Sequence, residues 1–187
     1  MEYKTQSLTK YLDDLSARLE APGGGSAAAL NAAMGASLVS MVINFTLGKP
    51  KYSKYEAELR SVLIKSDKLK DDFLSLVDLD VSAYKSKDPR KAMDVSLMLA
   101  RLCYEGIKIV APLIKKTNVN LITDTVIAVI FLESAFSAAC FNVQINLKML
   151  KDKELTCLIS KELRLKTRFV KHFRVKLEEK VGKIIRG

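Results

Sequence analysis

One segment organises this chain: Ala21-Pro22-Gly23-Gly24-Gly25-Ser26-Ala27-Ala28-Ala29-Leu30, in which a proline and three glycines precede an alanine-rich run. Because glycine has no Cβ, this loop can adopt a positive φ and let a ligand or another backbone approach closely. Ser26 is a suitable N-cap, so we expect a helix over about residues 26–47, ended by Gly48 and Pro50. The first turn of such a helix carries free N–H groups and partial positive charge, which suit a carboxylate or a phosphate. By itself, the segment is more often a tight turn that leads into a closely packed helix.

The remainder of the chain is also helical by its periodicity. Apolar residues recur three and four positions apart, and no alternating strand pattern occurs. Helices are expected at about residues 7–19, 26–47, 53–84, 89–116, 121–150 and 152–185. The helix at 26–47 is rich in Ala, Gly and Ser, and such small side chains let a neighbouring helix approach closely. We therefore predict an all-α fold, a single-domain bundle of about six helices over residues 1–187 with long central helices.

Local signals set two of these helix boundaries. Ser53-Lys54-Tyr55-Glu56 has the spacing of a capping box, which is expected to open the third helix. Asp88-Pro89 is expected to start the fourth helix, because a proline at the first helical position loses no hydrogen bond. Within that helix, Pro112 removes one hydrogen bond and can produce a kink.

The composition limits the class of protein. Apolar residues make up 49% of the chain and aromatic residues 7%, which is typical of packed helices rather than sheets. Cys103, Cys140 and Cys157 are odd in number and widely spaced, so they indicate reduced thiols in a cytosolic protein. A single histidine argues against a zinc site, and the polar residues after Met1 argue against a signal peptide.

The helices expected at 26–47 and 121–150 are apolar and long enough to raise the question of a membrane span. The second of them carries Glu133, Asn142 and Gln144, whose side chains would be costly to place in lipid. We therefore interpret this segment as a buried core helix, with a subunit interface as a further role for it.

The charge of the chain is uneven. The formal net charge is +10, and residues 151–187 hold twelve Lys/Arg against five Asp/Glu, a net of +7. Such a basic C-terminal helix, at 152–187, could attract nucleic acid or an acidic surface, although a solvated helix face is the commoner explanation. The segment has only Phe169 and Phe173 as aromatic residues, and both fall on its apolar face, where they are expected to pack in the core.

Five groups of polar residues could carry chemistry once the helices are placed. They are Gly23–Ser26; Asn44 with Lys51 and Tyr52 at the far end of the next helix; Asp80 with Tyr84; Asp124; and Asn142 with Asn146. The members of the pairs Asp80/Tyr84 and Asn142/Asn146 are four residues apart and so share a helix face. Taken singly, each group is more often a helix cap, a solvated residue or a hydrogen bond between helices than a functional site.

Together and in this order, these motifs resemble the cyclodeaminase/cyclohydrolase family of folate enzymes. That family includes the cyclodeaminase domain of formiminotransferase-cyclodeaminase and stand-alone methenyltetrahydrofolate cyclohydrolases. The resemblance runs from about Ser7 to Lys151, and its most specific parts are Pro22-Gly23-Gly24-Gly25-Ser26, Asn44-x-Thr46-x-Gly48-Lys49 with Lys51-Tyr52, and Asn142-Val143-x-Ile145-Asn146-Leu147. Thr123, Thr125 and Gln144 depart from the family's usual Ser, Gly and Arg at these positions.

The resemblance implies a helical homodimer that acts on N5/N10-bridged tetrahydrofolates as a cyclodeaminase or a cyclohydrolase, by acid/base catalysis without a metal. It implies Asp80 and Asp124 as the catalytic pair, with Asp124 as the proton carrier and Asp80 as its electrostatic partner. The substrate-binding residues would be Gly23, Gly24, Gly25, Ser26, Asn44, Lys51, Tyr52, Tyr84, Asn142 and Asn146, and Lys51 could meet the glutamate tail.

Two alternatives stay open at this point. The chain could be a non-catalytic helical protein that uses its basic C-terminal helix to bind nucleic acid or an acidic surface, or a family member that has lost catalysis. The Gly, Asn and Asp motifs in the apolar helices favour the enzyme, so nucleic acid and membrane are not the expected partners. The motifs do not separate a cyclodeaminase from a cyclohydrolase, since both reactions use the same carbon and similar groups.

Overall fold

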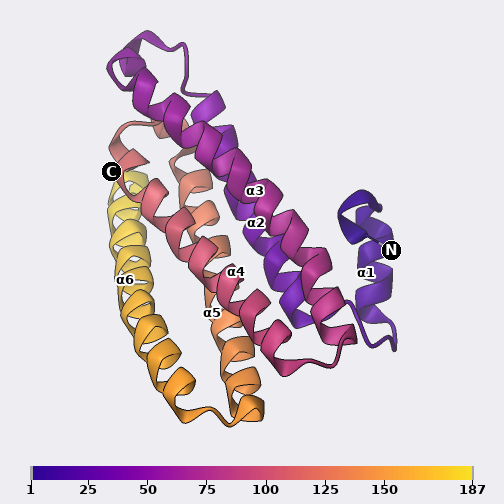
Figure 1. The fold of residues 1–187 in the computed structure, drawn as a ribbon. Helices are drawn as coiled ribbons and strands as arrows, with labels where there is room; N and C mark the ends of the chain where they lie inside the picture. The colour runs from indigo at the N-terminus through magenta and orange to yellow at the C-terminus, as the bar shows by residue number, and fades with distance from the viewer. Residues whose placement is uncertain (1, 187) are drawn as a thin grey trace.

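The structure is a computed structural model that describes residues 2–186, and every regular element in this range is helical (Figure 1). In chain order the elements are η1 (Tyr3–Thr5), α1 (Leu8–Ser16), α2 (Gly24–Asn44), η2 (Pro50–Tyr55), α3 (Glu56–Lys85), α4 (Pro89–Val110), η3 (Ala111–Lys115), η4 (Val119–Leu121), α5 (Ile122–Leu150) and α6 (Lys153–Arg186). The all-α prediction is confirmed.

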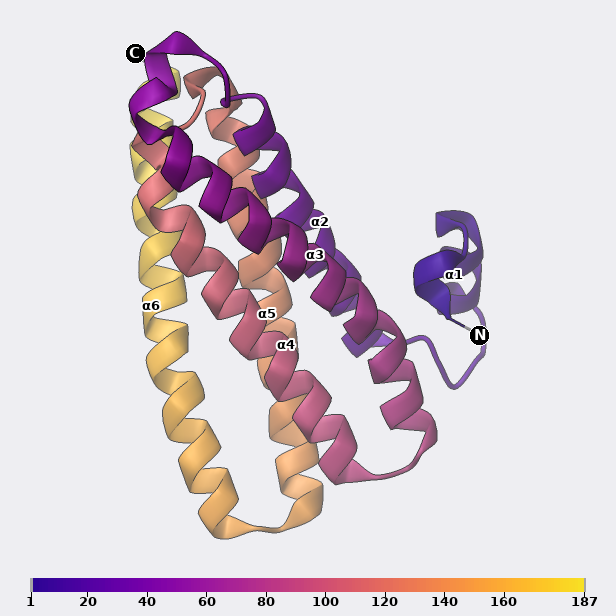
Figure 2. The ribbon, with the colours of Figure 1, turned by 45° about the horizontal axis from the view of Figure 1, so that its top comes forward.

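The five long helices α2–α6 form one elongated bundle. Helix α2 packs along α3 and α5, α4 packs along α5, and α6 lies against α5 on the side away from α2. The short α1 stands beside α2 and α3, as Figure 2 shows from a second direction. The start of α2, the end of α3, the start of α4 and the end of α5 therefore meet at one end of the bundle.

Helix α2 is central because its side chains are small, as the composition predicted. A Cβ on Gly35 would lie 3.0 Å from the side chain of Leu132 and 3.1 Å from the carbonyl oxygen of Ala128. The backbones of α2 and α5 are thus in direct contact, and the absence of a side chain at Gly35 permits it.

Several helix boundaries differ from the sequence prediction, and three of these differences have a clear local reason. Helix α2 begins at Gly24 with Gly23 as its N-cap, so Ser26 lies inside the first turn and is not the cap. Helix α3 begins only at Glu56, because Pro50–Tyr55 forms a 3₁₀ helix in which the hydroxyl of Ser53 donates to the carbonyl of Pro50 rather than capping. Helix α4 ends at Val110, before the 3₁₀ helix that contains Pro112, so the proline ends the α-helix rather than kinking it.

The buried face of α6 does not include Phe169 and Phe173, which were expected to pack in the core. Its buried residues are Ile159, Leu163, Val170, Leu177 and Val181. Phe169 is 37% exposed and Phe173 is half-buried. The ring of Phe169 meets that of Tyr104 edge-on at 5.3 Å and stacks on Phe173 at 6.3 Å. The two phenylalanines cover the edge of the α4–α6 contact instead of filling the core.

Part of the apolar surface of α2 and α5 is left uncovered. By length and composition alone, Gly24–Asn44 and Val119–Leu150 could cross a membrane, yet 61% and 44% of their most apolar windows are buried within the bundle. Large apolar side chains that remain exposed are Met34 on α2, Phe45 directly after α2, and Ile127, Phe141, Ile145 and Met149 on α5. We call these six residues the outer face of the bundle.

Candidate functional site

A cavity of about 800 Å³ opens at the end of the bundle where α2 begins. Its walls come from the glycine segment, the end of α3, the start of α4 and the last two turns of α5. Seven of the expected site residues line it: Gly23, Gly24, Gly25, Asp80, Tyr84, Asn142 and Asn146. Its volume lies in the range that proteins use to enclose small molecules and cofactors.

Asp80 is in contact with the first turn of α2. A Cβ built on Gly25 would lie 2.6 Å from Cγ and 2.8 Å from Oδ2 of Asp80, and closer still to Oδ1. Gly23, as the N-cap, has no side chain that could accept a hydrogen bond from this turn. Instead, the carboxylate of Asp80 on α3 accepts a hydrogen bond from the backbone N–H of Ser26 and so caps the start of α2.

The same contact sets the proton affinity of Asp80. Burial raises the pKa of its carboxyl above the ordinary value, and the hydrogen bond from the N–H of Ser26 offsets only part of that rise. A carboxyl with a raised pKa in a cavity holds a proton more readily than a free carboxyl does, which suits it to proton transfer.

Behind this acid lies a buried hydroxyl pair that the sequence did not reveal. The hydroxyls of Tyr11 and Ser26 are 3.1 Å apart, and the two residues are 3% and 0% exposed. Burial raises the pKa of Tyr11, the hydrogen bond with Ser26 lowers it, and the charge of Asp80 raises it further. In the sequence, Tyr11 belongs to the apolar face of the first helix. Its hydroxyl, which needs a hydrogen-bond partner when buried, was the one feature that could have indicated this pair.

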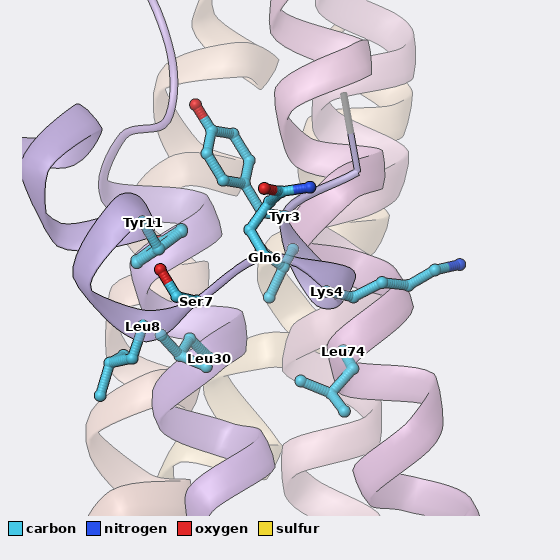
Figure 3. A pocket seen from close by; sticks show the side chains of 9 residues that line it. Tyr3, Lys4, Gln6, Ser7, Leu8, Tyr11, Leu30 and Leu74 are labelled. Carbon is cyan, nitrogen blue, oxygen red and sulfur yellow. The ribbon is translucent and has the colours of Figure 1, made fainter.

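The N-terminal segment holds Tyr11 in place. The backbone N–H of Tyr3 donates to the carboxylate of Asp78 on α3, and the rings of Tyr3 and Tyr11 meet edge-on at 5.4 Å. Figure 3 shows Tyr3 and Tyr11 beside a small cavity of about 170 Å³, which Leu30 of α2 and Leu74 of α3 also line. The segment from η1 to α1 therefore covers the back of the Asp80 site.

Asn142 and Asn146 lie on the α5 wall of the cavity. The side-chain amide of Asn146 donates to the backbone carbonyl of Asn142 at 2.9 Å, which fixes the Asn146 side chain. Tyr84, one helical turn after Asp80, is 59% exposed, and with Lys87 it lines the cavity from the end of α3.

The remaining expected site residues lie at the opposite end of the bundle. Asn44 is the last residue of α2, and Asp124 is in the first turn of α5. Asp124 precedes Asn142 by 18 residues on one helix, so the two are about 27 Å apart along its axis. Within one subunit, therefore, Asp124 is not brought to the cavity that Asp80 lines.

At this opposite end of the bundle, hydrogen bonds join the segment after α2 to the segment before α5. The N–H of Asn118 donates to Oγ1 of the fully buried Thr46 at 2.9 Å, and the N–H of Val119 donates to the hydroxyl of Tyr52 at 3.2 Å. Tyr52 is buried and so has a structural role, whereas Lys51 is exposed, with its Nζ 5.6 Å from the Tyr52 ring centre. Among residues 2–186, no group of three or more His, Cys, Asp or Glu is placed to hold a metal ion.

Comparisons with known proteins agree with the motifs. A model of the formiminotransferase-cyclodeaminase family matches residues 7–88 and 86–165. A methenyltetrahydrofolate cyclohydrolase of Methylorubrum extorquens is 36% identical, over 79% of this chain and 82% of that protein. The formimidoyltransferase-cyclodeaminase of Rattus norvegicus is 31% identical over 78% of this chain, which spans only 31% of that longer protein.

The fold has a close counterpart among solved structures. The formiminotetrahydrofolate cyclodeaminase of Thermotoga maritima aligns with a TM-score of 0.93 and 23% identity, over 98% of this chain and 100% of that one. No finding favours the non-catalytic alternative. Since the family model spans most of the sequence and a relative of similar length is more than a third identical, the chain belongs to the formiminotransferase-cyclodeaminase family.

Proposed function

We propose that this protein is a folate one-carbon enzyme that acts on N5/N10-bridged tetrahydrofolates, with Asp80 as its proton carrier. The observation that carries the proposal is the raised-pKa carboxyl of Asp80, held against the start of α2 in a cavity of about 800 Å³. The cyclohydrolase reaction is the first candidate, because the relative that matches this chain over most of its own length is named for it. The cyclodeaminase reaction is the second.

Both reactions pass through one tetrahedral carbon, and both need a proton to move twice. In the cyclohydrolase, water adds to the methenyl carbon and loses one proton; the bond from that carbon to N5 then breaks, N5 gains a proton, and the added hydroxyl loses its proton as the formyl group forms. In the cyclodeaminase, N10 attacks the formimino carbon and loses its proton, the imino nitrogen gains a proton, and the bond to the resulting amino group breaks as that group takes up a second proton and leaves as ammonia. Asp80 can accept the first proton as a carboxylate and return it as an acid. This reverses the roles that the resemblance implied for the two acids.

The surrounding residues are suited to holding the substrate. The first turn of α2 adds partial positive charge beside the carboxylate, and Gly23 and Gly24 leave space for a ring system. Asn142 and Asn146 offer amide groups on the opposite wall, and Tyr84 offers an exposed ring at the mouth for stacking. Lys87, also at the mouth, could meet a glutamate carboxylate in place of Lys51 of the same subunit.

We further propose that the enzyme is a homodimer joined through the outer face, and that Asp124 serves the cavity of the partner subunit. One face of α5 is apolar and exposed. It carries Ile127, Phe141 fourteen residues later and Ile145 four residues after that, spacings that place all three on the same side of the helix. In a two-fold dimer of antiparallel α5 helices, the start of each helix lies beside the end of the other. Asp124, Asn44 and Lys51 of each subunit would then approach the cavity at Asp80 of its partner.

The three free cysteines support a reducing compartment such as the cytoplasm. Cys103 is buried, Cys140 is half-buried and Cys157 is exposed, and none forms a disulfide in the described residues. We propose a cytoplasmic location on this ground.

The reaction is tested by offering the purified protein methenyl- and formimino-tetrahydrofolate separately and following the methenyl chromophore. A cyclohydrolase consumes the chromophore of the first, and a cyclodeaminase produces it from the second. Asp80→Asn should slow the active reaction by ~10²–10⁴-fold, whereas Asp71→Asn, an exposed acid on the same helix, should not. No turnover of either compound, or full turnover by Asp80→Asn, would contradict the proposal.

The shared site is tested by mixing two inactive variants. If Asp80 and Asp124 act together across the dimer, a mixed dimer of Asp80→Asn and Asp124→Asn subunits holds one intact site and one doubly altered site. Random exchange of subunits should then restore about a quarter of the wild-type activity. If both acids served the same subunit, every site in the mixture would lack one of them and no activity would return.

A further inference from the structure

A second cavity, on the opposite side of α5 from the first, is lined by three positive charges. It encloses about 400 Å³ between α5 and α6, and Arg164, Arg168 and Lys171 all face it from α6. These residues are four and three positions apart, so they share one face of the helix. The other lining residues are Cys140, Gln144, Leu147, Ser160, Leu163 and Thr167, and none of them is acidic.

These three cations have no acidic partner among residues 2–186. Two other cations of α6 are paired, Lys166 with Glu162 and Arg174 with both Glu133 and Glu178. No ion pair within the described range includes Arg164, Arg168 or Lys171. Like charges three and four residues apart on a helix repel one another. The cavity is therefore lined by three positive charges that no acidic side chain in the described range compensates, and the lining itself holds no acid.

The lining indicates the chemistry of a ligand. The cationic positions span seven residues of α6, or about 10 Å of helix axis, so a single compact anion would meet only part of them. Arginine forms paired hydrogen bonds with phosphate or carboxylate groups, and Ser160 adds a hydroxyl. Leu147 and Leu163 give the cavity an apolar floor, which suits a small molecule more than a hydrated ion.

We propose that this cavity binds an elongated small molecule with several anionic groups, a polyphosphate or a polycarboxylate. The site is separate from the proposed folate cavity, because Gln144 faces it from one side of α5 while Asn142 and Asn146 face the folate cavity from the other. A nucleic acid fits less well, since no aromatic side chain lines the cavity to stack on a base.

The experiment is a calorimetric titration of the full chain, without folate, at about 0.15 M salt. Tripolyphosphate and citrate are the two probes, and binding of either at one molecule per chain supports the site and identifies the anionic group. Arg168→Gln and Lys171→Gln should each weaken binding about tenfold or more, because each removes a charge-assisted hydrogen bond. Lys176→Gln removes the same charge from an exposed position of α6 outside the cavity and should leave the affinity within about twofold.

The proposal is overturned if neither probe binds saturably to the wild-type chain. It is also overturned if Lys176→Gln weakens binding as much as Lys171→Gln, because the attraction would then belong to the general charge of the helix. A single-stranded oligonucleotide that binds more tightly than both probes, and is displaced by neither, would equally contradict it. Circular dichroism melting of each variant confirms that a loss of binding is not a loss of fold.

Discussion

Replacing Gly25 by alanine tests the contact on which the proposed active site depends. The added Cβ would lie 2.6 Å from Cγ and 2.8 Å from Oδ2 of Asp80, closer than non-bonded atoms approach. Either the Asp80 side chain rotates away from the start of α2, or the two helices move apart. In both cases the carboxylate loses its hydrogen bond from the N–H of Ser26 and its place in the cavity.

Gly24→Ala is a matched control for the loss of stability expected in Gly25→Ala. A Cβ on Gly24 would meet nothing within 4 Å, although it occupies the same helical turn. Both substitutions gain the higher helix propensity of alanine, up to ~1 kcal/mol, so that gain cancels when the two variants are compared. Overpacking in a well-packed site costs about 1–3 kcal/mol. We therefore expect Gly25→Ala to be less stable than Gly24→Ala by about 1–3 kcal/mol.

Urea unfolding measures this difference, and steady-state turnover measures its consequence. A displacement of the acid by about 1 Å can cost ~10²-fold in rate, so Gly25→Ala should be nearly inactive even at a temperature where it is folded. Gly24→Ala lies at the cavity wall, and its turnover reports only the loss of space for the substrate. If Gly25→Ala matched Gly24→Ala in both stability and turnover, the contact between the glycine segment and Asp80 would be wrong.

Three further substitutions test the environment of this site and the opposite end of the bundle. Tyr11→Phe leaves the buried hydroxyl of Ser26 without its partner, so urea unfolding should show a loss of about 1–3 kcal/mol. The raised pKa of Asp80 means that its stabilising contribution is present below its unfolded pKa and is lost as the pH rises through its folded pKa. Asp80→Asn should therefore be inactive yet more stable than the wild type at neutral pH, with a flatter stability profile as the pH rises above the unfolded pKa of about 4; lower stability at neutral pH would refute this. Thr46→Val removes the acceptor of the buried N–H of Asn118 and should destabilise the fold by about 1–3 kcal/mol, which denaturant titration would detect.

The sequence predicted the elements of the fold well because their signals are local. Apolar spacing located all the long helices, and the small residues of α2 correctly marked it as central. The helix starts were less predictable, since Ser26 and Ser53 have the side chains of N-caps but bond to Tyr11 and Pro50 instead. The packing of the folded chain determines these partners, so a local sequence pattern cannot predict them.

The candidate site was only partly predictable for a related reason. The motifs were found in sequence, but the distances between them were not, and the two acids predicted as the catalytic pair, Asp80 and Asp124, lie at opposite ends of the subunit. Helix length alone could have shown this, because 18 residues of α5 separate Asp124 from Asn142. Tyr11 was missed because a tyrosine on an apolar face is usually a core residue, and its hydroxyl becomes informative only when Ser26 lies opposite it.

The glycine segment at the start of α2 and the position of the Asp80 carboxylate depend on each other. A serine or aspartate at the N-cap position would satisfy the first N–H groups of α2 from within the same helix, and Asp80 would then have no helix end to bind. With glycines there, the helix has no cap of its own, and the carboxylate from α3 fills that role while it remains exposed to the cavity. Burial favours the neutral form of the carboxyl, and the hydrogen bond from the helix end favours the charged form. Burial is the larger effect, so the pKa stays above its ordinary value, but by less than burial alone would raise it. A group balanced in this way can release and recover a proton within one turnover, which is what both candidate reactions require.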